Sequence, residues 1–379
     1  MNLRNQRILA AAVVGVAASL GGVVHADTLQ FKGVTDNAWD TVSNWYTVTD
    51  VAAGQKPEAG DVAAFTDLAA GSGPIAVNAG AGQIADQLLF GVNTVTATNP
   101  ILTRDVTLSG GPITLNGTAG GGGNLIGLAR PAGNTGAATI NNDLVLNSAL
   151  GTEQRFNIEN GSINTAAGPI TINGAISGTA GLRKVGAGTL VLNGNTNYQG
   201  LTTVQTGTVE FNGTTTAGGG VIVQANGRLA GLGTIAGNVA IGGTTATVAP
   251  GTAGVGTATL GITGNAAFQN STLALDLNGP SRSDLLDVDG LLSVGAGTRL
   301  AINALQPLDD PAYILATYGT LSGAFAAANV TGIPAGYELQ YNYNNAGQLA
   351  LVAVPEPAFL MAAPLAAVLL RRVRRQRSS

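Results

Sequence analysis

Two short strands closed by Asn-Gly turns, both within Leu182–Gly213, constrain the fold of this chain more than any other feature. Thr189–Leu192 and Thr208–Phe211 each alternate apolar with polar residues before the turn. Such alternation over about four residues predicts a half-buried strand. We expect the apolar side chains of both strands to face a core and Glu210 to face water. A unit of this size cannot bury its apolar face alone, so it needs neighbours of the same kind.

The same stretch resembles the autotransporter-associated β-strand repeat of bacterial surface proteins. The resemblance rests on Lys184–Leu190, on Asn197–Gly200 and on Gly207-Thr208, and it spans most of Leu182–Gly213. It implies a right-handed parallel β-helix that is exported and displayed on the cell. It implies no function beyond display.

The composition fits a stack of thin coils with an aliphatic core. The 379 residues include 56 Gly, and only 10% are charged, whereas an ordinary domain is about 25% charged. Aromatic residues make up 4% and hydrophobic residues 45%, so we expect a core of stacked Leu, Val, Ile and Ala. Cysteine is absent, which excludes disulfides and thiolate chemistry. Stability must therefore come from repeated backbone ladders over an apolar stack.

Further strand-like segments recur at short, fairly even spacings. Downstream of Gly213 they are Val221–Val223, Asn238–Ile241, Thr259–Ile262, Leu273–Leu277, Leu300–Ile302 and a closing pair, Ala312–Thr317 and Thr320–Phe325. Gly168–Gly174 repeats Gly111–Gly117 almost letter for letter, which we interpret as an internal repeat. No segment between residues 194 and 353 has the apolar periodicity of a helix. Strands alone leave a sandwich or a β-solenoid, and the repeated turn phrases favour the solenoid.

The N-terminus has the parts of a signal peptide. Arg4 and Arg7 precede an apolar run of small residues, 8–24, and the run ends in Val-His-Ala. The small residues of that triplet match the pattern that signal peptidase reads, so we predict cleavage after Ala26. The alternative is an uncleaved membrane anchor. Cleavage also removes His25, the only histidine.

A block of aromatic residues follows the predicted cleavage site. Residues 27–66 hold about a third of the aromatic side chains, Trp39 and Trp45 among them. We interpret the block as a cap, because the first coil of a solenoid needs bulky residues to cover an otherwise open stack. A second interpretation is carbohydrate stacking, in which the two tryptophans present their indole faces to a polysaccharide.

An acidic segment, Ser283–Gly290, is the best candidate for chemistry. Asp287 and Asp289 alternate with Val288, so on a strand both carboxylates would lie on the solvent face, and oxygen ligands at this spacing suit Ca²⁺. The known calcium loops are missing from the sequence. We therefore favour a solvated strand face over a metal site.

Catalysis is the minority interpretation. Without cysteine and without a histidine after cleavage, Ser-His-Asp and Cys-His catalysis and His-ligated zinc are excluded. A polysaccharide lyase using Asp-bound Ca²⁺ and a basic residue, or a glycosidase with two carboxylates, stays open. Arg282 beside Asp284 is the sole grouping of a basic residue with an acid on one predicted strand face. We predict no catalytic residue and no cofactor.

Charge is distributed unevenly along the chain. Residues 27–353 contain ten Lys and Arg against twenty Asp and Glu, a net charge of about −10. Nucleic-acid binding requires a basic stripe. We therefore predict no nucleic-acid partner.

The C-terminal segment, 354–379, has three parts in order. Pro355, Glu356 and Pro357 are followed by an apolar run, 358–370. The basic end contains Arg371, Arg372, Arg374, Arg375 and Arg377. A stable transmembrane helix needs about 20 apolar residues, and arginines stay on the cytoplasmic side. A run this short predicts transient contact with the inner membrane.

This tail closely resembles the PEP-CTERM sorting signal, whose motif matches residues 355–357. The resemblance implies recognition and removal of the tail by an exosortase-type membrane protease, in a Gram-negative bacterium that makes exopolysaccharide. A plain C-terminal anchor is the alternative.

These features predict five parts. They are a signal peptide (1–26), an N-terminal cap (27–66), irregular solenoid coils (67–180), a solenoid with the strand repeat at 182–213 (181–353) and the sorting signal with its short membrane helix (354–379). We predict an all-β, non-catalytic structural or adhesive protein of the outer membrane, cell surface or extracellular matrix. Its expected partners are signal peptidase, an exosortase-type protease and exopolysaccharide, and the alternative functions are a polysaccharide-active enzyme and a carbohydrate-binding module.

Overall fold

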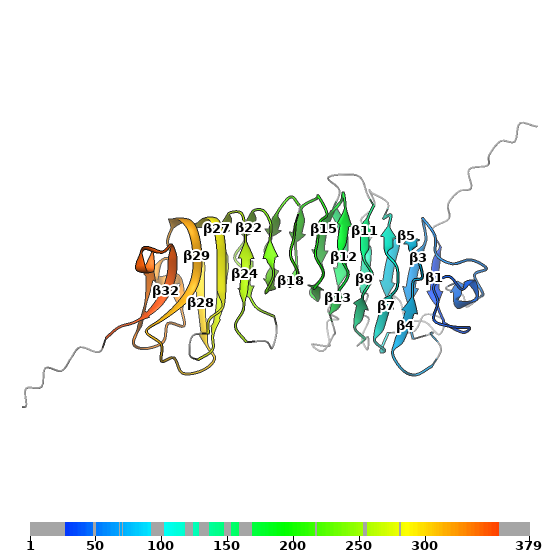
Figure 1. Ribbon diagram of the computed structural model, residues 1–379, viewed down its shortest axis with the longest axis horizontal. Helices are drawn as coiled ribbons and strands as arrows, with labels where there is room; N and C mark the ends of the chain where they lie inside the picture. The colour runs from blue at the N-terminus through cyan, green and yellow to red at the C-terminus, as the bar shows by residue number, and fades with distance from the viewer. Residues whose placement is uncertain are drawn as a thin grey trace, which may run out of the picture.

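The computed structural model describes most of the chain between residues 27 and 355. The described ranges are 27–47, 51–67, 69, 71–91, 102–117, 124–128, 136–147, 153–158, 169–216, 218–252, 256–279 and 282–355. Within them the chain forms an elongated stack of strands, with the N-terminal strands at one end and the C-terminal strands at the other (Figure 1).

The strands form three sheets that run along the stack. Sheet A comprises β1 (Thr28–Phe31), β2 (Trp45–Thr47), β3 (Val62–Phe65), β6 (Gln87–Phe90), β9 (Asn124–Leu128), β12 (Glu153–Ile158), β15 (Gly181–Val185), β17 (Thr202–Val204), β19 (Val221–Val223), β21 (Thr234–Ile235), β22 (Val239–Gly242), β24 (Thr259–Ile262), β25 (Ala266–Gln269), β27 (Leu285–Val294), β29 (Ala312–Gly323), β31 (Tyr337–Tyr341) and β32 (Gln348–Ala353). Sheet B comprises β4 (Ile75–Asn78), β7 (Val106–Ser109), β10 (Ala138–Ile140), β13 (Ile170–Ile172), β16 (Thr189–Leu192), β18 (Gly207–Phe211), β20 (Gly227–Gly231), β23 (Thr247–Pro250), β26 (Thr272–Leu277), β28 (Arg299–Ala304) and β30 (Val330–Thr331). Sheet C comprises β5 (Gln83–Ala85), β8 (Ile113–Leu115), β11 (Leu144–Leu146) and β14 (Ile176–Gly178). Three 3-10 helices, η1 (Val42–Asn44), η2 (Ala327–Asn329) and η3 (Tyr343–Asn345), lie near the two ends.

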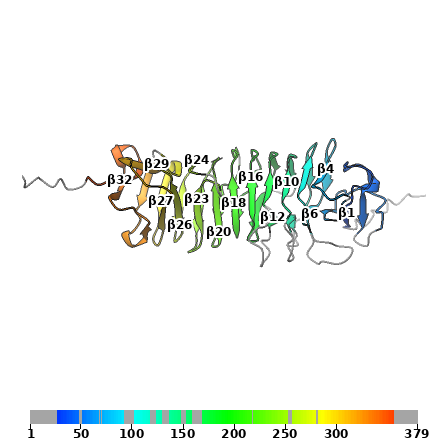
Figure 2. The ribbon, with the colours of Figure 1, turned by 90° about the horizontal axis from the view of Figure 1, so that it is seen from below.

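The chain visits the three sheets in turn and then returns to the first one level further along. From β6 in sheet A it passes to β7 in sheet B, to β8 in sheet C and back to sheet A at β9. Neighbouring coils pair in parallel throughout the middle of the stack, as between β16 and β18. The stacked coils are seen from a second side in Figure 2. This arrangement is compatible with the predicted β-helix, whose handedness stays a prediction.

The coils differ in length along the stack. Leu190 of β16 pairs with Val209 of β18, and Val209 pairs in turn with Leu229, so the coils of this region are short. Ala138 of β10 pairs with Ile170. These two residues are more than one and a half times as far apart in the chain as Leu190 and Val209, so the coil between them is long. The short coils lack a sheet C strand, and single bridges such as Ile176 with Thr196 take its place. The stretch that resembles the strand repeat lies in these short coils.

The core consists of apolar columns that cross the coils. One column on sheet B contains Ala138, Ile170, Leu190, Val209, Leu229, Val248, Leu273 and Leu300, which are register partners and are all buried. Burying one such aliphatic side chain fully contributes about 1.5–3 kcal/mol. The predicted inward residues of β16 and β18 are thus confirmed. The expectation that Glu210 faces water is wrong, because this side chain is only 8% exposed.

The N-terminal end departs from the parallel pattern. β1 pairs in parallel with β3 but antiparallel with β2. Phe31, Trp39, Trp45 and Phe65 form a cluster of rings here, with Trp39 and Trp45 centroids 5.0 Å apart in an edge contact. Rings in such contacts stabilise the packing by about 0.5–1.5 kcal/mol beyond the area that they bury. The cluster adds large aromatic side chains to the core of the first coil, beside the buried Leu29 and Ala63.

The C-terminal end is also antiparallel. β32 runs antiparallel to β29 on one side and to β31 on the other. The predicted closing pair of two separate strands is therefore wrong, since residues 312–323 form the one long strand β29. The pairing with β27 shifts register between Val288 and Leu291, and an irregularity of this kind bends a strand.

The predicted internal repeat is wrong in its geometry. Residues 113–115 form β8 in sheet C, whereas residues 170–172 form β13 in sheet B. Both phrases make strands of the same burial pattern. The shared motif specifies a short half-buried strand, but it does not specify which side of the coil the strand occupies.

The described residues contain strands, turns and 3-10 helices, and no α-helix. None of the helices in the described part of the chain is long and apolar enough to cross a membrane. The predicted membrane-sorting helix at 358–370 and the predicted signal peptide lie outside the described residues.

Candidate functional site

The most unusual side chain of the repeat is Lys184. It lies on β15 with no exposed surface. Its Nζ donates hydrogen bonds to three backbone carbonyls, of Val185 at 2.8 Å, Gly186 at 2.6 Å and Thr206 at 3.2 Å. A buried ammonium group is tolerated only where such acceptors surround it. Lys184 thus joins the corner of its own coil to the corner of the next.

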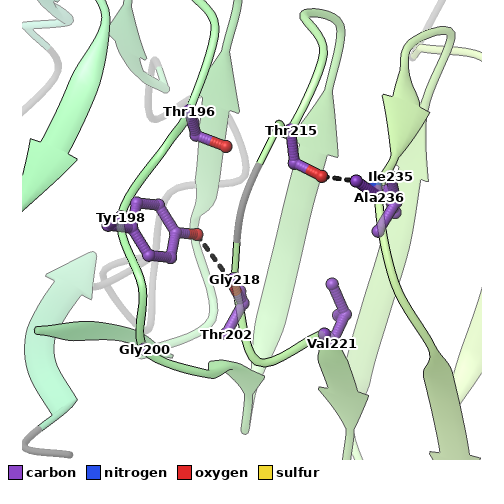
Figure 3. Close-up of a pocket in the computed structure, with 10 residues that line it drawn as sticks. Thr196, Tyr198, Gly200, Thr202, Thr215, Gly218, Val221, Ile235 and Ala236 are labelled. Carbon is purple, nitrogen blue, oxygen red and sulfur yellow. Dashed lines mark hydrogen bonds between the residues drawn. The ribbon is translucent and has the colours of Figure 1, made fainter. Parts of the chain in front are cut away.

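Tyr198 has a similar internal role. It is 3% exposed, and its hydroxyl lies 2.5 Å from Thr202 Oγ1. Burial raises the pKa of Tyr198 to about 12, against a smaller opposing effect of that hydrogen bond. Tyr198 and Thr202 line a cavity on the third side of the short coils, where Thr215 and Ile235 also lie (Figure 3). The cavity measures about 10 Å³, at the lower limit for a single water, so it is packing space and not a ligand site.

A ladder of asparagine amides runs along the edge of sheet B. Each Nδ2 donates to the Oδ1 of the preceding coil, from Asn173 to Asn141 at 2.7 Å, from Asn193 to Asn173 at 2.8 Å and from Asn212 to Asn193 at 2.9 Å. The next position holds Leu232, which is 48% exposed. The ladder therefore ends at Asn212, whose Oδ1 accepts no hydrogen bond within the described structure.

A column of glycines follows this ladder by one residue. A Cβ added at Gly174, Gly194, Gly213 or Gly233 would lie closer than 3.0 Å to a backbone carbonyl oxygen of the preceding coil. The Asn-Gly turns are therefore required by the close approach of successive coils. This explains why the turn dipeptide recurs in the repeat.

The outer face of sheet B carries a shallow groove of about 400 Å³ with both polar and apolar lining. Its lining residues are Pro169, Thr171, Thr189, Val191, Asn193, Glu210, Asn212 and Thr252. Glu210 lies between Val191 and Ala230 in register, which explains its low exposure. Sequence reasoning missed this surface, because Thr252 reaches it from a connection two coils away.

The second interpretation of Trp39 and Trp45, carbohydrate stacking, does not fit their burial. Trp39 and Trp45 both have no exposed surface, and the indole Nε1 of Trp45 donates to the backbone oxygen of Trp39 at 2.8 Å. An indole must be exposed to stack on a sugar. These two residues therefore serve the core of the first coil.

The two candidate metal ligands lie on the outward face of β27, as expected. Asp289 is exposed and Asp287 half-buried, and Thr317 Oγ1 donates to Asp287 Oδ1. The described residues contain no group of three or more acids or histidines that could hold a metal ion. The solvated strand face therefore stays a prediction for this pair.

Asp284 differs from both because it is 2% exposed. Its carboxylate accepts the backbone N–H of Ala258 and of Asp276, each at 2.9 Å. Burial raises the pKa of Asp284, and these two hydrogen bonds oppose the rise. Arg282, which the sequence places beside it, is exposed, so the two do not form a shared surface site. Asp284 joins neighbouring coils.

The predicted processing sites fall mainly outside the described residues. Ala26, Glu356, Pro357 and Arg371, Arg372, Arg374, Arg375 and Arg377 are all in that group. Pro355 is exposed directly after β32 and Val354, whose N–H donates to Gly336 O at 2.7 Å. The predicted sorting motif, whose sorting role stays a prediction, therefore begins two residues after the end of β32.

Parallel coils that stack along one axis, with motif residues that hydrogen-bond within the stack, define an elongated stack of β-strands. The family model of the passenger-associated-transport-repeat matches residues 182–211. This repeat is associated with autotransporter-type passenger domains, consistent with an exported protein of the bacterial surface. The match covers a small part of the chain and identifies the repeat alone. Comparison with curated proteins finds no match.

Proposed function

We propose that this chain is an exported, non-catalytic structural or adhesive protein of the surface or extracellular matrix of a Gram-negative bacterium. Its right-handed β-helix would act as a rigid spacer, and residues 354–379 would act as a PEP-CTERM signal that contacts the inner membrane transiently through 358–370. Signal peptidase would cut after Ala26 and an exosortase-type protease would remove the tail.

The observation that carries the proposal is the use of the polar motif residues. Lys184 and Tyr198 both direct their polar atoms into the stack, and the amides of the asparagine ladder bind one another. A surface repeat built in this way provides length and stability. The passenger-associated repeat supports export.

Processing at both ends is testable by mass. In a Gram-negative host that supplies an exosortase-type protease, we expect the surface protein to begin at Asp27 and to lack the basic tail. Glu356→Ala should leave the tail attached, because it removes the only charge of the Pro-Glu-Pro motif. Glu58→Ala, a change of the same kind at an exposed position, should process normally. Intact protein of full-length mass in the cytosol would contradict the proposal.

A second candidate function is polysaccharide binding in the groove on sheet B. The groove offers amide, hydroxyl and carboxylate groups over about 400 Å³, and sugar hydroxyls pair with such groups. Its size falls within the range of about 300–1,000 Å³ for ligand sites.

Incubation of the full chain with exopolysaccharide separates these functions. Shortening of the polysaccharide indicates an enzyme, retention without shortening a binding module, and neither outcome a scaffold. We expect neither. If retention occurs in the groove, Thr171→Trp should abolish it by filling the groove. Thr107→Trp is the matched control, because Thr107 lies two coils away in the same outward column and outside the groove.

A further inference from the structure

The ends of a stack of strands leave edges, and the described sheets protect most of them. β30, the last strand of sheet B, has only two residues. At the other end of sheet B, a bridge between Ala38 and Asn78 covers part of the edge of β4. A bridge between Tyr46 and Ala52 covers part of the edge of β2 in the same way. β31 is different, since its five residues contain one charge and no proline. Long edges without such protection are templates for pairing with another chain.

The outer edge of β31 directs backbone groups away from the sheet. Val354 N–H donates to Gly336 O next to the pair Tyr337 with Ala353, so Gly336 and Val354 form a hydrogen-bonded pair. Backbone groups alternate in direction along an antiparallel strand. The N–H and C=O of Leu339 and Tyr341 therefore point away from β32. Within the described chain, β32 is the only strand that pairs with β31.

The sequence of β31, Tyr-Glu-Leu-Gln-Tyr, is close to a palindrome. If two copies meet antiparallel about Leu339, each Tyr337 lies opposite a Tyr341 and each Glu338 lies opposite a Gln340. Leu339 meets its own copy in a hydrogen-bonded pair, for which its outward N–H and C=O are already oriented. Every residue thus finds a compatible neighbour, and aromatic and amide–carboxylate cross-strand pairs stabilise such ladders.

We propose that two copies of this protein pair through β31, and that sheet A becomes continuous across a two-fold axis at Leu339. The contact is isologous, so it closes at a dimer and does not propagate into a fibre. Two rods then meet at their C-terminal ends, with their N-terminal caps pointing outward. This inference does not depend on the sorting signal or on any ligand.

An apolar groove lies beside β31, on the face of the strand that carries Leu339 and Tyr341. A second copy of the chain paired with β31 would cover this groove. The groove measures about 460 Å³, and its lining includes Phe325, Val330, Ile333, Leu339 and Tyr341. Ile333 is 37% exposed. In the proposed register the partner's Leu339 and the partner's Tyr341 lie on the groove side of the ladder, because directly opposite residues share a face. The pairing therefore adds apolar side chains at an exposed apolar surface.

Sedimentation velocity of the full chain over a range of concentrations tests the proposal. We expect a monomer–dimer equilibrium. Leu339→Pro should leave only monomer, because it removes the central N–H donor from both copies without removing a bond to β32. Gln340→Glu should raise the dissociation constant about tenfold, because it places two carboxylates opposite each other on both sides of the axis.

A charge exchange distinguishes pairing from misfolding. Glu338→Lys combined with Gln340→Glu restores opposite charges across the axis and should return the dissociation constant to about its original value. Gln224→Glu adds the same charge at an exposed position in the middle of the rod and should have no effect. A thermal melting curve checks that each variant folds. Monomer at every concentration, larger open assemblies, or a dimer that ignores Leu339→Pro and Gln340→Glu would overturn the proposal.

Discussion

Replacing Gly194 by alanine is expected to destabilise the protein by about 3 kcal/mol. A Cβ at this position would lie closer than 3.0 Å to the carbonyl oxygen of Gly174 in the preceding coil. A backbone oxygen cannot move aside as a flexible side chain can, so the two coils must separate. The separation also lengthens the hydrogen bond between Asn193 and Asn173. Urea unfolding followed by circular dichroism measures the change.

Gly242→Ala is the matched control for this prediction. A Cβ at Gly242 meets no atom within 4 Å, and the residue has no positive φ. Alanine there reduces the entropy of the unfolded chain, so the unfolding midpoint should stay the same or rise slightly. Equal losses at both positions would show that close approach of the coils is not the reason for glycine at position 194.

Replacing Lys184 by methionine is expected to cost about 2–4 kcal/mol. Methionine fills a similar volume, but the carbonyls of Val185, Gly186 and Thr206 lose a buried donor. Leaving a buried acceptor without its partner costs about 1–3 kcal/mol. Loss of the charge relieves part of the desolvation cost of the ammonium group. The free energy of unfolding from urea titration measures the net effect.

Arg183→Ala tests whether burial or charge matters on this strand. Arg183 is the neighbour of Lys184, its side chain is 39% exposed, and its Nε lies 3.0 Å from Glu153 Oε2. A partly exposed ion pair of this kind contributes about 0–1 kcal/mol. A loss at Arg183 as large as that at Lys184 would contradict the role assigned to the buried ammonium group.

The sequence alone predicted the local strands well. Thr189–Leu192 and Thr259–Ile262 are strands with the predicted bounds, because alternation and turn residues act over a few residues. The inward residues of the repeat followed from the same period of two. These signals are local, and so they carry over directly into the structure.

The errors concern relations between distant residues. The phrase shared by residues 111–117 and 168–174 is used on two different sides of the coil. The sequence made no prediction for the burial of Lys184, since no local pattern shows that three carbonyls surround it. The antiparallel hairpin of β31 and β32 was missed because its strands alternate in the same way as the parallel ones. Orientation depends on connections, which short patterns do not encode.

The regular register of the short coils has a consequence for the history of such proteins. Leu190, Val209 and Leu229 occupy one position in three successive turns of the chain. Deleting or duplicating the segment 194–212 in a gene would therefore shorten or extend the molecule by one turn, about 4.8 Å, and would leave both ends unchanged. The length of the molecule would then change in fixed steps of one turn, while the sequences of both termini stay the same.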